Sequence, residues 1–271
     1  MFQLLTIGWY KEKSWRPYLI VREWESKTIR KIEILGREIN VRFKKERHCI
    51  GYRDLKGEDR YFFFSCPKNF PIVKASQCEF CEEKDIVRRM EINPESLPEE
   101  IRKEMHCLYL AYFSKELIKC GVALERNLEN RLIEQGALAA VVLEKMKDGI
   151  EIRRREKEVA SENKFKLSIS AEEKEKIFSK GINLEEEEKK FKEVLKKLGI
   201  EEEIISLKNA YNFRSFDKCV KAQNIQGKIK FCIGEFLFFE KNAKLFFFNV
   251  SENRGKLFEF GKEKNTIFDF I

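Results

Sequence analysis

The sequence predicts an α+β protein, with β-strands near both ends of the chain and alternating strands and helices between them. Three observations predict this class. Residues 1–64 mix apolar–polar alternation with β-branched and aromatic residues, which is typical of strands. Residues 225–250 show the same pattern, interrupted by glycines. Residues 127–198 instead carry helix-capping residues and apolar residues at helical spacing.

The N-terminal strands lead into a segment of different composition. The expected strands are residues 17–22, 32–35 and 39–43, and the expected turns are Gly36 and residues 54–57. From Cys66 to Pro98 the chain is dominated by cysteine, proline and charged residues, which is typical of a small module held together by a metal. Residues 1–100 are therefore expected to be a β-rich region that contains a four-cysteine zinc module.

Residues 101–165 predict a small α/β domain. Its expected elements are a strand over 106–112, a strand over 117–122, a helix from Asn127 to near Gly136, a strand over 139–143 and a helix over 150–162. The first two strands are close enough in sequence to form a hairpin across residues 114–116.

The last part of the chain predicts helices followed by strands. In the charged helical segment, residues 166–210, Ser170 begins a capping box and a helix over 184–198 stops at Gly199. Residues 211–271 are expected to form a β meander. Its strands are residues 228–233, 235–239 and 244–250. We expect this meander to pack with the N-terminal β region.

Composition excludes a disordered chain and gives only a weak indication of the partner. A hydrophobic fraction of 43% with 24 Phe among 271 residues supplies a substantial core, in one large domain or two to three small ones. The net charge of +8 permits a polyanionic partner without requiring one. The charged fraction of 37%, mostly Lys and Glu, fits either a heat-adapted protein or an AT-rich genome.

The chain is expected in the cytoplasm and not in a membrane. Its first residues lack the basic start and apolar run of a signal peptide, and no stretch approaches about 18 uninterrupted apolar residues. Eight cysteines without a secretion signal indicate a reducing compartment, where clustered cysteines bind metal more often than they form disulfides.

Four of these cysteines have the spacing of a metal site. Cys49, Cys66, Cys78 and Cys81 follow the pattern C-x16-C-x11-C-x2-C. Four thiolates around one Zn²⁺ leave no position open for water, so the predicted role is structural. The alternative is an accidental CxxC beside two buried thiols. The remaining cysteines have apolar neighbours and are expected to be small core residues: Cys107, Cys120, Cys219 and Cys232.

A second set of residues suggests phosphodiester chemistry. Tyr109 lies on one expected strand, Lys119 on the next, and Arg131 on the following helix, with Glu156 and Glu158 on a later helix. A tyrosine can assist a nucleophilic water, an arginine can bind phosphate oxygens in a fork, and a glutamate can hold a divalent ion. Each residue also has a structural interpretation: a core aromatic, a solvated helix arginine, or ordinary helix glutamates.

The order of these residues resembles the GIY-YIG nuclease superfamily over residues 105–162. The family's first strand motif is matched by Leu108-Tyr109-Leu110 and its second by Lys119-Cys120-Gly121. Its helix motif is matched by Asn127-Leu128-Glu129-Asn130-Arg131. The resemblance implies a small three-stranded sheet with helices, and Mg²⁺- or Mn²⁺-dependent cleavage of structured DNA or RNA. Two departures, Lys119 for the second tyrosine and Ala123 for a hydroxyl residue, leave binding without cleavage open.

The chain as a whole is also similar to an uncharacterised prokaryotic family. The motifs are Cys49-Ile-Gly-Tyr52, Cys66-Pro67, Gln77-Cys-Glu-Phe-Cys81, His106 with Tyr109-Leu-Ala111, and Ile133-Glu-Gln-Gly-Ala137. This resemblance implies no established activity. His106 is a further candidate acid or base, or else a structural histidine.

Three hypotheses follow: a metal-dependent nuclease, a non-catalytic zinc-containing DNA- or RNA-binding protein, and a protein-interaction scaffold built on the Lys/Glu helices. DNA or RNA is the expected partner, and the oligomeric state is not defined by the sequence. Arg153-Arg-Arg155 fits either a solvated helix face or a contact with the phosphate backbone.

Overall fold

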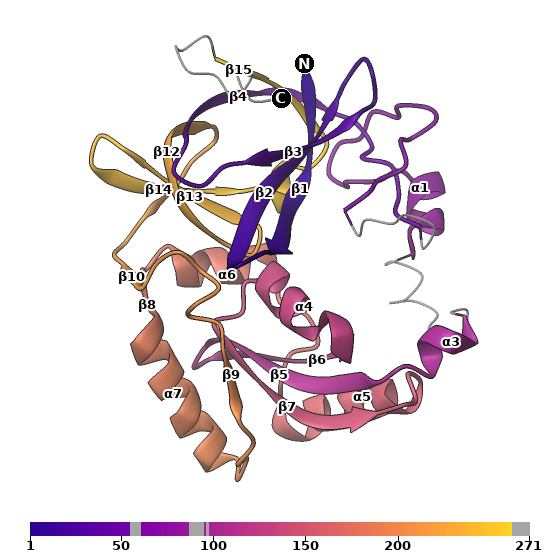
Figure 1. Cartoon of the computed structure of the whole chain (residues 1–271), viewed down its shortest axis with the longest axis vertical. Coiled ribbons are helices and arrows are strands. Elements are labelled where there is room, and N and C mark those ends of the chain that lie inside the picture. Colours follow the sequence, from indigo (N-terminus) through magenta and orange to yellow (C-terminus); the bar gives the residue numbers. More distant parts are fainter. Residues whose placement is uncertain (55–60, 87–94, 96–97, 262–271) are drawn as a thin grey trace.

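A computed structural model describes residues 1–54, 61–86, 95 and 98–261 of the chain. The described helices are α1 Glu79–Lys84, α3 Glu99–Arg102, α4 Leu128–Gln135, α5 Glu151–Asn163, α6 Ala171–Phe178 and α7 Leu184–Lys197. Most of the turn expected at residues 54–57 lies outside the described residues. The α+β class is confirmed, with one large mixed sheet and one smaller antiparallel sheet (Figure 1).

The large sheet combines strands from both ends of the chain. Its nine strands, in spatial order, are β11 Val220–Lys221, β14 Lys244–Asn249, β13 Phe236–Lys241, β12 Ile225–Ile233, β4 Glu38–Arg47, β15 Lys256–Phe260, β1 Phe2–Lys11, β2 Trp15–Glu23 and β3 Ile29–Glu33. Ile225 pairs with Val41, and Phe258 pairs with both Phe43 and Phe2. The last described strand is therefore inserted between two N-terminal strands.

The small sheet carries the middle of the chain. Its strand order is β6 Leu117–Leu124, β5 His106–Ser114, β7 Ala139–Met146 and β9 Ile204–Ser206. The strands predicted at 106–112, 117–122 and 139–143 are all present, each longer than expected. The fourth, β9, was not predicted, because its three residues lie in the charged helical segment. Strands β8 Ile182–Asn183 and β10 Ser215–Phe216 form a separate antiparallel pair.

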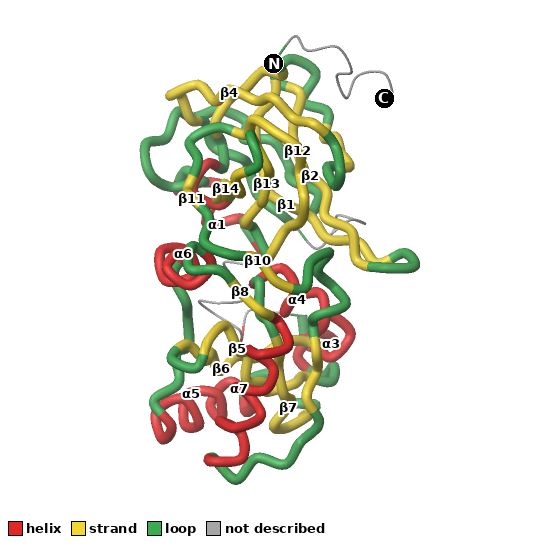
Figure 2. The backbone as a smooth tube through the Cα atoms, turned by 90° about the vertical axis from the view of Figure 1, so that its left-hand side faces the viewer, coloured by secondary structure: helices red, strands yellow, loops and turns green. Residues whose placement is uncertain are grey.

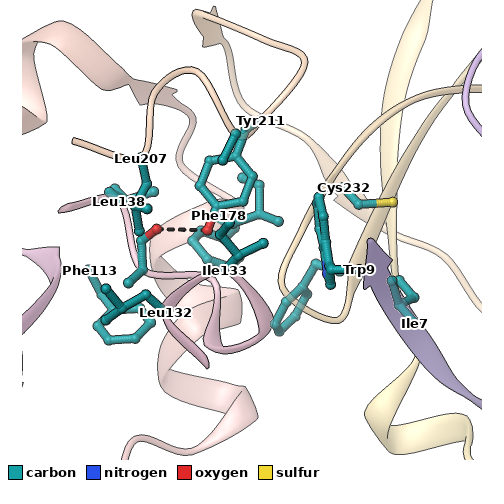
Figure 3. Close-up of a cluster of buried hydrophobic side chains, with 14 of the residues drawn as sticks. Ile7, Trp9, Phe113, Leu132, Ile133, Leu138, Phe178, Leu207, Tyr211 and Cys232 are labelled. Atoms are coloured by element: carbon teal, nitrogen blue, oxygen red, sulfur yellow. Dashed lines mark hydrogen bonds between the residues drawn. The ribbon is translucent and has the colours of Figure 1, made fainter. Parts of the chain in front are cut away.

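Helices cover both faces of the small sheet (Figure 1). Tyr112 of β5 points to α7, where its ring lies 4.8 Å from that of Phe191 and its hydroxyl donates to Glu187 at 2.8 Å. Residues on the opposite face of β5 point to α4, because successive strand side chains alternate. Figure 3 shows one of them, Phe113, beside Leu132 of α4.

Two of the predicted helix boundaries are confirmed by their caps. Helix α4 ends at Gly136, whose φ of 77° is a left-handed conformation that glycine adopts without strain and other residues do not. The Ser170 hydroxyl accepts from the Glu173 N–H at 3.2 Å, and the Glu173 carboxylate accepts from the Ser170 N–H at 2.9 Å, which completes the capping box.

One hydrophobic core includes residues of both sheets and of α4. Helix α4 lies between the two sheets (Figure 2), and Figure 3 shows part of this core. Ile133 of α4 packs there with Trp9 from the large sheet. The Trp9 indole donates to the Gly234 carbonyl at 3.1 Å, and the Tyr211 hydroxyl donates to the Ala137 carbonyl at 2.7 Å. The second of these bonds holds the residue that follows the C-terminal cap of α4.

The four cysteines expected in the core are all buried there: Cys107, Cys120, Cys219 and Cys232. Among the described helices none is long and apolar enough to cross a membrane.

Candidate functional site

The four-cysteine module brings its thiols to one point. Cys49 follows β4 by two residues, Cys66 comes from a later loop, Cys78 caps the N-terminus of α1, and Cys81 lies within that helix. All four Sγ atoms lie within 4.8 Å of one another, and those of Cys66 and Cys78 are 3.9 Å apart. Three of the four are buried and Cys78 is half-buried. The predicted cluster is confirmed.

Backbone N–H groups converge on the Cys49 thiol. The N–H groups of Gly51 and Cys78 donate to its Sγ at 3.4 and 3.3 Å. Gly51 adopts a φ of 85°, and a side chain there would collide with the Phe64 carbonyl oxygen at 1.7 Å. Burial raises the pKa of Cys49 to about 11 against the effect of these donors. A bound divalent ion reverses that penalty, because metal-coordinated thiols lose their protons.

The donor set fits one structural metal ion. Burial raises the pKa of Cys66, but the N–H groups of Phe70 and Lys68 lower it further, so that the net shift favours the thiolate. Four thiolates in a buried cluster match a tetrahedral ion of the zinc type and leave no open position for chemistry. This cluster could therefore hold a metal such as zinc.

A second cluster surrounds the phenol of Tyr109. Tyr109 pairs with Gly121 across β5 and β6, and its ring lies over that glycine. A Cβ at position 121 would come within 2.7 Å of both Cζ and Oη of the phenol. Only glycine at position 121 therefore leaves room for the Tyr109 ring, which is 1% exposed.

Helix α4 supplies two polar groups to this phenol. Arg131 and Gln135 are one helical turn apart and face the same side. The Gln135 amide donates to the Tyr109 hydroxyl at 3.1 Å and accepts from the Lys119 ammonium at 3.4 Å. Burial raises the pKa of Tyr109, and the neighbouring Arg131 guanidinium and Gln135 amide reduce that rise without cancelling it. The phenol is therefore protonated at neutral pH.

Helix α5 brings one carboxylate to the same place. Glu156 accepts a hydrogen bond from the Val122 N–H on β6, and its charge acts on Tyr109. Burial raises the pKa of Glu156, opposed by the nearby Arg153 and Lys119 cations. A half-buried carboxylate with a raised pKa gains much from a cation placed beside it.

The structure thus brings together Tyr109, Lys119, Gly121, Arg131, Gln135 and Glu156, which we call the Tyr109 cluster. Two predicted residues have other partners. Glu158 is exposed and accepts from Arg155 at 3.0 Å on the surface of α5. The Nδ1 atom of His106 lies 2.8 Å from the Glu104 carbonyl oxygen, its ring packs against Gly149, and burial lowers its pKa.

Two members of the surroundings were not predicted as site residues. Gln135 could have been found, because it is four residues after Arg131 on the same helix face. Lys174 of α6 carries no sequence signal. Its ammonium donates to the Gln135 carbonyl at 2.7 Å, and burial lowers its pKa to about 8. It places a further cation beside Arg131.

The family model described as "Protein of unknown function (DUF2797)" matches residues 36–256. That span includes all four clustered cysteines and every residue of the Tyr109 cluster. No curated protein and no protein of solved structure matches the chain.

Proposed function

The chain belongs to the DUF2797 family, and we propose that it binds a phosphodiester of DNA or RNA at the Tyr109 cluster and cleaves it with the help of one divalent ion. The observation that supports this proposal is the convergence itself. A guanidinium from α4 and a carboxylate from α5 both act on the phenol from β5, although the three residues are far apart in the chain.

Each group has a role in that chemistry. Arg131 offers a fork of N–H donors to the phosphate oxygens, and Lys119 adds a second positive charge. Glu156 would hold one Mg²⁺ or Mn²⁺ ion, which would stabilise the leaving oxygen. Because its pKa is raised, the Tyr109 phenol keeps its proton at neutral pH and cannot act as a base. It would instead orient the attacking water through a hydrogen bond from its hydroxyl.

The order of elements also supports the proposal. A β5–β6 hairpin, helix α4, strand β7 and helix α5 follow one another, with β5 in the middle of the three antiparallel strands. This order is compatible with the three-stranded sheet with helices that the resemblance to GIY-YIG nucleases implies, to which β9 adds a fourth strand. The glycine that ends the second strand motif has a physical reason here, since it makes room for the tyrosine ring.

The test is a cleavage assay on branched, single-stranded and double-stranded DNA and RNA with Mg²⁺ or Mn²⁺. Tyr109→Phe, Arg131→Met and Glu156→Gln are expected to lower the cleavage rate by about 100-fold or more. Glu158→Gln is the matched control, since it lies two residues away on the exposed face of α5. Cleavage that falls equally in the control, or in none of the variants, would reject the proposal.

Binding without cleavage is the second candidate function. It is favoured by the burial of the Tyr109 phenol and by exposed aromatic side chains on the cysteine module, namely Phe62, Phe70 and Phe80. Exposed rings can stack on the bases of a single strand. If the protein binds without cleaving, none of these substrates should be cleaved. Binding should need no added Mg²⁺ or Mn²⁺ and should weaken steeply as salt rises.

A further inference from the structure

A tetrathiolate metal centre in a protein interior carries a net negative charge that needs compensation. One Zn²⁺ with four thiolates carries a net charge of about −2, and charge removed from water is costly unless an opposite charge or hydrogen-bond donors compensate it. Backbone N–H groups satisfy part of that need at Cys49 and Cys66. They contribute dipoles, however, and no formal positive charge.

A buried arginine lies close enough to the cluster for the charges of its cysteines to act on it. Arg22, on β2, is 2% exposed. One of its terminal nitrogens donates to the Gln3 side-chain oxygen at 2.9 Å and the other to the Phe63 carbonyl at 3.0 Å. Its Nε is buried and has no hydrogen-bond partner among the described residues. These are neutral acceptors, so they leave the charge of the guanidinium uncompensated.

The same arginine is connected to the backbone of two cluster loops. The Gln3 amide nitrogen donates to the carbonyls of His48 and Cys49, at 2.9 and 3.3 Å. Phe63, the other acceptor, precedes Cys66 by three residues. The guanidinium therefore holds, directly or through Gln3, the segments that present two of the four thiols.

We propose that Arg22 is the built-in counter-charge of the four-cysteine metal centre and positions its Cys49 and Cys66 loops. The electrostatics agree. Burial lowers the pKa of Arg22 to about 10, and the charges of Cys49, Cys66 and Cys81 act in the opposite direction. The arginine is thus charged at neutral pH. The inference concerns the metal centre alone and does not depend on the function proposed for the Tyr109 cluster.

The experiment measures Zn²⁺ affinity of the full-length chain by competition with a chromophoric chelator. Arg22→Met is expected to bind Zn²⁺ about 10-fold to 100-fold more weakly, the range typical of lost outer-sphere partners. Arg16→Met is the control, because Arg16 is on the same strand but exposed and paired with Glu33. Unchanged affinity in folded Arg22→Met would overturn the proposal.

A second pair of variants separates charge from packing, and serves if Arg22→Met does not fold. Arg22→Lys keeps the charge, whereas Arg22→Gln keeps a hydrogen-bonding group without charge. The lysine variant is expected to bind Zn²⁺ more tightly than the glutamine variant and to give the absorption spectrum of a tetrathiolate Co²⁺ site. Equal affinities for the two variants, or tighter binding by the glutamine variant, would contradict the counter-charge.

Discussion

Gly121 and Tyr109 show how one missing side chain can shape a site. The phenol occupies the space that a Cβ at position 121 would take, and this allows its hydroxyl to reach Gln135. The sequence predicted that Tyr109, Arg131 and the glycine belong to one motif order, and these residues do lie close together. It could not choose between Glu156 and Glu158. That choice depends on the face of α5 that packs on β6, which is a matter of tertiary packing.

Gly121→Ala is expected to destabilise the protein by about 1–3 kcal/mol, because the added methyl must push the buried Tyr109 ring aside. Urea unfolding measures the change. In a Tyr109→Leu background, which lacks the colliding ring atoms, the same substitution should cost less. Equal costs in both backgrounds would show that the ring is not what requires glycine.

Helix α1 and its loops depend on the cysteines because they have little other core. Among the described residues, the hydrophobic cluster of this module has three buried members, Cys49, Cys66 and Cys81. The apolar side chains packed against it are those of Tyr52, Ile72 and Cys78. The spacing of the cysteines predicted their convergence, since ligand spacing is local information. Arg22 was missed, because a charged residue in an expected strand gives no sign that it will be buried.

Zinc removal is expected to unfold this module. Protein purified without chelators should contain about one Zn²⁺ per chain by elemental analysis, and a strong chelator should lower its melting temperature. Cys81→Ser should reproduce the effect, whereas Cys232→Ser, in the main core, should leave the zinc content unchanged. Metal-free protein whose melting temperature does not respond to Zn²⁺ would contradict a structural metal.

Asp85 anchors the end of α1 and gives this module a pH dependence. Burial raises its pKa, but Arg53 and hydrogen bonds from the Arg53 N–H and the Gln77 amide, at 3.0 and 2.9 Å, lower it more. Because its pKa is lowered in the folded state, ionised Asp85 stabilises the protein at pH values above the unfolded-state pKa of about 3.9. This stabilisation is lost as the pH falls from that value through the lower folded-state pKa.

Asp85→Asn is therefore expected to cost about 2 kcal/mol at pH 6 and progressively less as the pH falls from 4 toward the lower folded-state pKa. Urea unfolding of the two proteins across this range checks the trend. A difference between them that stays constant down to acid pH would show that the charge of Asp85 contributes nothing.

At the scale of the whole molecule, the two ends of the chain are joined in one sheet. Phe258 of β15 is fully buried and its ring contacts those of Phe43 and Phe2 on either side. Local patterns predicted most strands of the middle and of the meander. They could not predict that β15 lies between β4 and β1, because strand order is set by contacts between residues more than 200 positions apart.

Phe258→Ala should accordingly cost about 3–5 kcal/mol, because it leaves a cavity where the N- and C-terminal strands meet. Phe62→Ala is the control, since its ring is 42% exposed. Denaturant unfolding followed by tryptophan fluorescence measures both, as all three tryptophans lie in the first 24 residues. A small loss in Phe258→Ala would mean that the two ends are not energetically coupled.

Arg131, Tyr109 and Glu156 are proposed to form one site for a phosphodiester and its metal ion. Electron paramagnetic resonance can test this by following Mn²⁺ binding to zinc-loaded protein in the presence of an oligonucleotide. Wild type and Glu158→Gln should each bind one Mn²⁺ per chain, and Glu156→Gln should bind it at least about tenfold more weakly. Equal Mn²⁺ binding by all three proteins would contradict the claim.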